Sequence, residues 1–344
     1  MEYYCTIFTA TESWLEKDLL WTGSDDGVVS VSRDGGKHWD KVTPKDCPSW
    51  MMWNCIETDP FKKGTAYIVG TRYKSDDFAP YIYKTEDYGS TWRLITNGID
   101  ARHFTRVLRA DPKRAGLLYA GTEYGMYISY DDGSSWRKFQ LNLPVVPVTD
   151  LCIKDNDLIV ATQGRAFWVL DDLTPVQQYD PAIASKALYA FPVRPTWRIP
   201  GIDSRYAAYM RVPVNAGANP PNGAVISFFL KEVTDSTRAS IRLMDRDRKV
   251  IKTYSTDDKE NKLDISKGMN VFNWNLMYPG AETIDGMILW NGTPSGILAP
   301  PAEYHYSLKV DKDSVEGSFH VVADPNYKCT QQEYDAQHAG GRKR

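Results

Sequence analysis

Three aspartates with the same local surroundings are the first residues of this sequence that suggest chemistry. Asp34, Asp87 and Asp131 each follow a Ser or Thr by two residues and precede a Gly by two. Two carboxyl groups about 5 to 10 Å apart can act as acid and base on a glycosidic bond. We expect these three, however, to occupy equivalent turns of successive repeats, too far apart to share one substrate bond. They are therefore interpreted as structural residues.

A second group with chemical potential is the segment Gly164-Arg165-Ala166-Phe167-Trp168, which places a guanidinium beside two aromatic rings at a glycine turn. A guanidinium can bind a carboxylate through two parallel hydrogen bonds, and planar apolar side chains suit sugar rings and peptides. Arg165, Phe167 and Trp168 are therefore candidate ligand-binding residues. An Arg packed on a Trp would serve the fold equally well, so the structural alternative stays open.

The cysteines do not predict a metal site. They are five in number, with no C-x-x-C pair, which argues against both zinc and a dense disulfide framework. Cys5, Cys55 and Cys152 each fall in the first strand of a repeat, and we expect them to be buried thiols. A Cys47–Cys55 bridge is conceivable but has no support. No phosphate-binding or dinucleotide-binding fingerprint is present either, so no metal and no cofactor are expected.

Composition limits the class of partner. The chain has 344 residues, 42% of them hydrophobic, and a formal net charge of −3. A nucleic-acid partner is not expected, because the basic excess typical of such binders is missing. No membrane span is expected, because the sequence contains no run of 18 apolar residues. Its first residues also lack the charged start and apolar core of a signal peptide.

The three aspartates belong to a longer pattern, S-x-D-x-G-x-T-W, known as the Asp box. Its positions are Ser32, Asp34, Gly36 and Trp39, then Thr85, Asp87, Gly89 and Trp92, then Ser129, Asp131, Gly133 and Trp136. The pattern predicts a β-hairpin turn in which the Asp binds backbone amides and the Gly takes a positive φ. The Trp is expected to enter the core as the next strand begins.

The spacing of these boxes predicts a propeller. Asp34 and Asp87 are 53 residues apart, Asp87 and Asp131 are 44 apart, and Asp171 follows after another 40. A period of roughly 40 to 50 residues with four short strands per unit is typical of propeller blades. The fourth unit keeps Asp171 but has neither the Gly nor the Trp, and its outer strand is expected from residues 187–191.

The predicted fold is all-β, with four recognisable propeller blades over residues 1–195. The chain begins inside a strand, so we expect these to be the last blades of a larger propeller whose N-terminal blades are missing. Residues 196–221 are rich in Pro, Gly, Arg and Asn, as in a linker. Residues 222–328 alternate like the strands of an immunoglobulin-like β-sandwich. Residues 329–344 are expected to be a frayed or truncated tail.

Several segments together resemble large bacterial Asp-box (BNR) repeat proteins, which look like relatives of the sortilin propeller and are often labelled glycosyl hydrolase. The segments are 84–92, 111–122, 143–148, 164–172, 217–221, 272–276 and 300–304. The resemblance implies a FlgD-like or immunoglobulin-like C-terminal domain. It also implies a secreted or periplasmic location. Gln163 replaces the His that is usual before Gly-Arg, which weakens any case for a catalytic base at that position.

Two functions stay open from the sequence. The first is a non-catalytic binding or scaffold module that recognises a protein or glycan partner through propeller loops and exposed aromatics such as Trp50, Trp53 and Tyr73. The second is a glycoside hydrolase of the Asp-box propeller type, similar to xyloglucanases or sialidases, with catalytic residues partly outside this chain. The first is favoured, because the sequence offers no convincing pair of acids.

Overall fold

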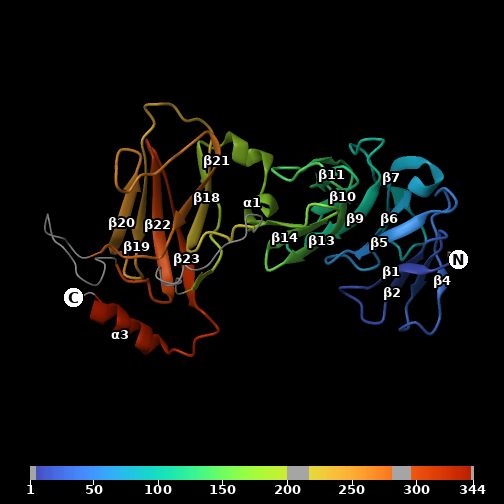
Figure 1. Ribbon diagram of the computed structural model, residues 1–344, viewed down its shortest axis with the longest axis horizontal. Coiled ribbons are helices and arrows are strands. Elements are labelled where there is room, and N and C mark those ends of the chain that lie inside the picture. The colour runs from blue at the N-terminus through green and yellow to red at the C-terminus, as the bar shows by residue number, and fades with distance from the viewer. Residues whose placement is uncertain (1–4, 200–216, 281–295, 342–344) are drawn as a thin grey trace. The chain divides into compact units, whose positions relative to one another are not determined.

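The computed structural model describes residues 5–199, 217–280 and 296–341, and it is almost entirely β-structure (Figure 1). Two compact units divide the chain, Met1–Leu173 and Thr174–Arg344. The boundary therefore precedes the expected end of the propeller at residue 195. No helix in the described part of the chain is long and apolar enough to cross a membrane.

The first unit consists of four antiparallel sheets, each formed by consecutive strands, and these are the predicted blades. Blade 1 contains β1 (Ile7–Glu12), β2 (Leu20–Ser24), β3 (Val29–Ser32) and β4 (Asp40–Lys41). Blade 2 contains β5 (Met52–Thr58), β6 (Ala66–Arg72), β7 (Asp77–Thr85) and β8 (Arg93–Leu94). Blade 3 contains β9 (Thr105–Ala110), β10 (Leu118–Thr122), β11 (Gly125–Ser129) and β12 (Arg137–Lys138). Blade 4 contains β13 (Val148–Lys154), β14 (Asp157–Thr162) and β15 (Phe167–Leu170).

The blades pack face to face through apolar layers. Trp21 and Val31 of blade 1 and Ile68 and Tyr83 of blade 2 lie in one buried cluster. Because blade 3 has a neighbour on each side, β10 is buried at every position, which explains its continuous apolar sequence. In β15, by contrast, exposed and half-buried residues alternate.

The fourth blade corrects two expectations. Its outer strand does not come from residues 187–191, because β16 (Leu188–Ala190) pairs with β18 (Ala224–Leu230) in the second unit, where Leu188 packs on the core. Leu170 pairs with Leu158 as Ser129 pairs with Leu118, so Asp172, not Asp171, stands at the position of Asp131. The spacing of the boxes, which led from Asp131 to Asp171, therefore placed the aspartate of the fourth turn one residue too early.

The second unit is a two-layer β-sandwich. One sheet has the order β16, β18, β21 (Gly268–Trp274), and the other has the order β17 (Thr196–Arg198), β23 (Asp313–Ala323), β22 (Ala302–Val310), β19 (Ala239–Met244), β20 (Val250–Ser255). Phe228, Trp274, Tyr304 and Phe319 share its core, and Trp274 packs on Tyr304 with ring centres 5.3 Å apart. Two strands of the sandwich thus precede residue 222, the expected start. Much of the expected linker, residues 200–216, lies outside the described residues.

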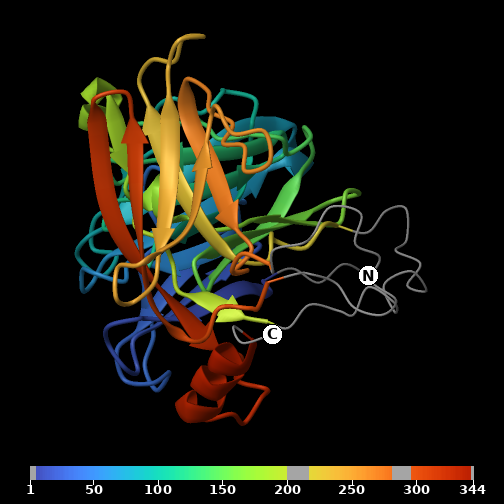
Figure 2. The same ribbon diagram turned by 90° about the vertical axis from the view of Figure 1, so that its left-hand side faces the viewer.

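Short helices complete this unit. They are α1 (Thr174–Gln177), the 3₁₀ turn Pro181–Ser185 and α3 (Gln331–Gly341), which lies at one end of the sandwich (Figures 1 and 2). Tyr334 of α3 is buried, and Arg198 donates a hydrogen bond to Gln337 Oε1 at 2.9 Å. The described part of the tail is therefore a docked helix and not a frayed end.

Candidate functional site

The Asp-box turn of blade 3 is held by a closed set of hydrogen bonds. Ser129 Oγ donates to Asp131 Oδ1 at 2.8 Å and accepts from the amide of Gly133 at 2.9 Å. Asp131 also accepts from the amide of Ser135 at 2.8 Å and from its hydroxyl at 2.5 Å. The aspartate thus binds the backbone of its own turn, as a structural group does.

The turns of blades 1 and 2 repeat this geometry. The amide of Gly36 donates to Ser32 Oγ at 2.8 Å, and the amide of Gly89 donates to Thr85 Oγ1 at 2.9 Å. Hydrogen bonds from the backbone and ring of His38 hold the pKa of Asp34 well below its usual range. Each box aspartate is thus engaged in a separate turn, which supports the structural interpretation.

The predicted ligand-binding residues lie at the turn between β14 and β15. Trp168 Nε1 donates to the main-chain oxygen of Arg165 at 3.0 Å, so these two residues do meet. Phe167 pairs with Ala161, and Trp168 pairs with Val160. Because successive strand residues point to opposite faces, the two aromatic rings do not lie on one surface. The three side chains therefore do not form a single cluster.

Two further expectations about side chains need correction. Trp53 was expected to be exposed, but it is buried in β5 and packs edge-on against Tyr83 at 5.9 Å. Trp50 is exposed as expected. Cys5 and Cys152 are exposed, not buried, and Cys55 alone of the three predicted thiols is buried. Cys47 and Cys55 are both free thiols, so they form no bridge.

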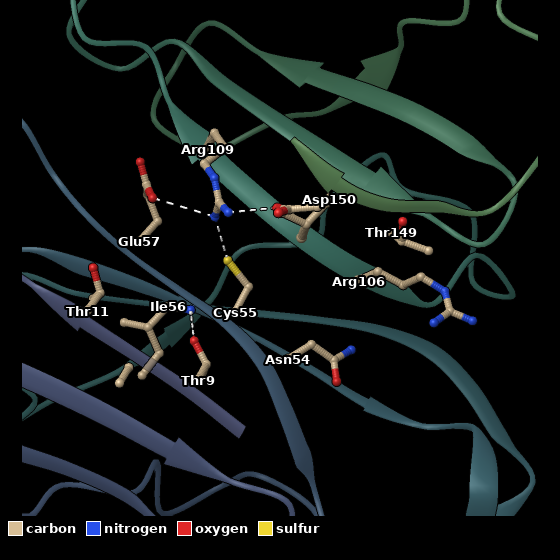
Figure 3. Close-up of a pocket in the computed structure, with 12 residues that line it drawn as sticks. Thr9, Thr11, Asn54, Cys55, Ile56, Glu57, Arg106, Arg109, Thr149 and Asp150 are labelled. Atoms are coloured by element: carbon tan, nitrogen blue, oxygen red, sulfur yellow. Dashed lines mark hydrogen bonds and ion pairs between the residues drawn. The ribbon is translucent and has the colours of Figure 1, made fainter. Parts of the chain in front are cut away.

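A pocket of about 430 Å³ opens where the first strands of all four blades, β1, β5, β9 and β13, come together (Figure 3). We call it the inner-strand pocket. It is lined by Thr9, Ala10, Thr11, Asn54, Cys55, Ile56, Glu57, Arg106, Val107, Arg109, Thr149 and Asp150. Most of these residues carry a hydroxyl, an amide or a charge, so the pocket offers many hydrogen-bonding groups and little apolar surface.

Arg109 of β9 is the centre of this pocket (Figure 3). Its Nη2 binds Asp150 Oδ1 at 2.7 Å, and its Nε donates to the main-chain oxygen of Leu151 at 2.8 Å, both in β13. Its Nη1 lies 2.9 Å from Cys55 Sγ in β5. One guanidinium thus joins the inner strands of blades 2, 3 and 4.

Glu57 of β5 is the buried acid of the pocket. Its Oε1 accepts a hydrogen bond from the amide of Ala110 at 3.2 Å, and its Oε2 lies 3.6 Å from Arg109 Nη1. Burial raises the pKa of Glu57 to about 7, because the charged form loses its water and these two partners restore only part of that loss. Near neutral pH this carboxyl therefore populates both protonation states.

Hydrogen bonds also hold two other polar side chains of the pocket, Arg106 and Asn54. Arg106 Nε donates to Glu123 Oε2 at 2.6 Å, and its guanidinium lies over the ring of Phe104 at 5.1 Å. Asn54 Nδ2 donates to Thr71 Oγ1 at 3.2 Å.

Among the described residues, no group of His, Cys, Asp or Glu side chains is arranged to hold a metal ion.

Sequence reasoning missed Glu57, Arg109 and Asp150, since none lies in a motif. The sequence does, however, contain a pattern that could have indicated Glu57 and Arg109. Glu57 pairs with Tyr67, and Arg109 pairs with Tyr119, so the two occupy the same position in successive first strands. Opposite charges at one position of two aligned and largely apolar strands would have predicted a contact between the blades.

Similarity to known proteins is found among solved structures. No protein-family model matches the sequence, and no curated protein is detectably similar to it. Among solved structures, YCF48 bound to a D1 peptide is 20% identical with a TM-score of 0.38, covering 48% of this chain and 52% of that one. YCF48 from Cyanidioschyzon merolae is 15% identical with a TM-score of 0.37, covering 48% of this chain and 53% of that one. The GH74 xyloglucanase from Xanthomonas campestris is 10% identical with a TM-score of 0.38, covering 90% of this chain and 45% of that one.

The chain thus spans about half the length of the solved structures named here. Likenesses at these identities and TM-scores assign no activity to it.

Proposed function

We propose that this chain is a non-catalytic binding module of the propeller type, which recognises a protein or glycan partner through the inner-strand pocket. The observation that carries the proposal is the position of Arg109 in blade 3, whose guanidinium binds acceptors of blade 2 and blade 4 at once. Such a network fixes the shape of the pocket before a ligand arrives, and a preformed site loses less entropy on binding.

The lining suits a polar partner. Thr9, Thr11 and Thr149 supply hydroxyls, Asn54 supplies an amide, and Arg106 supplies a second guanidinium. Sugar hydroxyls and peptide main chains both bind through hydrogen bonds to groups of this kind. The resemblance stated above places such a module outside the cytoplasm, and we retain that location as part of the proposal.

The two acids of the pocket favour binding over catalysis. Glu57 accepts from the amide of Ala110, and Asp150 is held by Arg109 at 2.7 Å. A glycosidase instead needs one carboxyl that donates a proton and a second that attacks or activates water. In the described structure both acids are engaged with the protein itself.

A glycoside hydrolase is the second candidate, because of one specific observation. The pKa of Glu57, about 7, is close to the value that a general acid needs near neutral pH. Asp150 lines the same pocket and would be the second carboxyl.

Glycan and peptide arrays test the proposal. The unaltered chain should bind a subset of the probes, and Asp150→Asn should weaken that binding while the circular dichroism spectrum stays unchanged. Arg165→Ala serves as the matched comparison, since Arg165 is the residue that the sequence favoured. Loss of binding in Arg165→Ala but not in Asp150→Asn would place the ligand at the turn between β14 and β15 and contradict the pocket.

The same probes separate the two functions. Each glycan that binds is incubated with the chain, and the release of reducing ends is measured. The proposal predicts none. Product release that Glu57→Gln abolishes, with binding retained, would establish the hydrolase in its place.

A further inference from the structure

A second pocket, of about 280 Å³, lies in blade 3 and shares no lining residue with the inner-strand pocket. We call it the blade 3 pocket. Its lining includes three rings and one cation, namely His103, Tyr124, Tyr127 and Lys138. Its wall is mostly apolar, whereas the inner-strand pocket is mostly polar. The two pockets therefore suit ligands of different chemical classes.

The three rings of the blade 3 pocket are packed on one another. His103 stacks on Tyr124 with ring centres 4.7 Å apart and planes 30° from parallel. Tyr127 packs edge-on against His103 at 6.0 Å. Tyr127 is 2% exposed and Tyr124 is 47% exposed, so the stack runs from the core to the surface. Its outer part offers a flat aromatic surface on which a planar ring can stack.

The hydrogen bonds of Tyr127 determine which nitrogen of His103 carries the proton. Tyr127 Oη accepts from the amide of Asp100 at 3.3 Å and lies 2.9 Å from His103 Nδ1. The phenol hydrogen finds its acceptor in Nδ1, and the neutral ring then carries its hydrogen on Nε2. Burial lowers the pKa of His103, so the ring is neutral at neutral pH. Within the part of the chain that the structure describes, Nε2 has no protein partner.

Lys138 of β12 gives the pocket a positive charge. It pairs with Tyr127, so the two side chains lie on the same face of the blade. Lys138 is exposed and forms no ion pair with another described residue. The charge of Asp100 also acts on His103, but Asp100 Oδ1 accepts from the amide of Arg102 at 3.0 Å, and Asp100 does not line the pocket. The pocket thus favours an anion over a cation.

One wall of the pocket is fixed by Gln140, which follows β12. Its Nε2 donates to the main-chain oxygens of Leu143 at 2.8 Å and Pro144 at 2.9 Å. Its Oε1 accepts from the amide of Met126 at 3.3 Å. A Cβ on Gly125 would lie 2.0 Å from this oxygen, so a glycine is needed there. The loop after β12 is therefore tied to β11, and the pocket is formed before a ligand arrives.

The combination of a ring and a cation distinguishes blade 3 from the other two blades with four strands. Lys41 of blade 1 occupies the position of Lys138, but it pairs with Ser30. Leu94 of blade 2 occupies the same position and pairs with Tyr83. Blade 1 thus has the cation without the ring, and blade 2 has the ring without the cation.

We propose that the blade 3 pocket binds a small aromatic carboxylate. The ring of the ligand stacks on Tyr124 and His103, and its carboxylate accepts hydrogen bonds from Lys138 Nζ and His103 Nε2. A cavity of about 150 Å³ holds one benzene ring, so a pocket of about 280 Å³ admits one ring with its carboxylate and no longer chain. This site is independent of the function proposed for the inner-strand pocket.

Isothermal titration calorimetry with three matched probes tests the ligand class. The probes are 4-hydroxybenzoate, benzylamine, which has a ring but the opposite charge, and cyclohexanecarboxylate, which has the charge but no planar ring. 4-Hydroxybenzoate should bind to one site per chain, about fivefold or more tighter than either of the others. Absence of binding at millimolar concentration, or equal binding of benzylamine, would overturn the proposal. Equal binding of cyclohexanecarboxylate would overturn it too, because the rings would then contribute nothing.

Variants of exposed residues test the place of binding. Lys138→Gln and Tyr124→Leu should each weaken binding of 4-hydroxybenzoate about fivefold or more. The matched controls Lys41→Gln and Tyr327→Leu change exposed residues of the same type and should bind as the unaltered chain does. Asp150→Asn, in the inner-strand pocket, should also leave this binding unchanged. Equal losses in Lys138→Gln and Lys41→Gln, or a loss in Asp150→Asn alone, would show that the ligand binds elsewhere.

Discussion

Trp136 and Trp39 occupy the same position in two nearly identical turns, yet their surroundings differ. Trp136 is 5% exposed and donates to the main chain of the preceding blade, whereas Trp39 is partly exposed and donates within its own turn. The local hydrogen bonds around Ser129 and Ser32 are the same. The motif therefore determines the turn, and the neighbouring blade determines how much the Trp contributes to stability.

The largest expected effect on stability tests this difference between Trp136 and Trp39 directly. Trp136→Ala should lower the free energy of unfolding by about 3 to 5 kcal/mol, because it leaves a cavity between blades 2 and 3. Trp39→Ala should cost less than about 1 kcal/mol in dilute solution, because its ring is already partly in water. Urea unfolding followed by circular dichroism measures both. Equal costs would show that the Trp acts within its turn and not between the blades.

The pKa values of two acids show the same contrast between an environment within one turn and an environment between blades. Hydrogen bonds within the turn lower the pKa of Asp34, whereas burial between blades raises that of Glu57 to about 7 from 4.5. As pH rises from about 4.5 to about 7, the unfolded chain ionises Glu57 before the folded chain does, so the free energy of unfolding falls. The loss is about 3 kcal/mol for a shift of this size.

Glu57→Gln should remove that contribution. Relative to the unaltered chain, the variant should gain about 3 kcal/mol between acid and weakly alkaline solution. Urea midpoints measured below pH 4.5 and above pH 7 give the difference. An identical pH dependence for the two proteins would mean that Glu57 ionises normally, and it would also remove the observation that favours a hydrolase.

A smaller effect on stability is expected from the box aspartates, because their turns in blades 1 and 3 have the same geometry. Asp131→Ala and Asp34→Ala should each cost about 1 to 3 kcal/mol, since each leaves turn amides without their acceptor. Because this role is local, the two costs should agree within about 0.5 kcal/mol. Thermal unfolding compares them. A much larger cost in blade 3 would show that the aspartate also supports the contact between blades.

The smallest effect on stability is expected at Phe167 of β15, which is 75% exposed. Phe167→Ser should change the free energy of unfolding of the single chain by no more than about 0.5 kcal/mol, because the ring is exposed. Strand pairing places Met126 of β11 at the same position in blade 3, where it is 3% exposed, so Met126→Ser should cost about 2 kcal/mol or more. Urea unfolding in dilute solution measures both. A large loss in Phe167→Ser would mean that the ring of Phe167 packs on another part of the chain.

Much of the fold was predictable from local sequence. The boxes at Asp34, Asp87 and Asp131 marked three blades, because hydroxyl, Asp, Gly and Trp specify a turn without distant partners. The all-β class, the blades and the following β-sandwich are confirmed. The fourth blade was less predictable. Leu170 replaces the hydroxyl there, so the pattern no longer indicates the register, and β16 joins the sandwich through apolar contacts that spacing does not reveal.

The inner-strand pocket could not be predicted from local sequence. Glu57, Arg109 and Asp150 come from three different blades, and their contact exists only once the blades are packed side by side. The segment around Arg165 looked like a site because its residues are adjacent in sequence. Adjacent strand residues face opposite ways, however, and this separates Phe167 from Trp168.

Hydrogen exchange read by mass spectrometry, with and without the glycan or peptide that binds best on the arrays, tests the central claim most directly. The account predicts slower exchange on ligand addition in the inner strands β5, β9 and β13, which carry Glu57, Arg109 and Asp150. Exchange at residues 163–168 and in the β-sandwich should be unchanged. Protection confined to residues 163–168, or to the sandwich, with none in those inner strands would contradict the assignment of the pocket as the binding site.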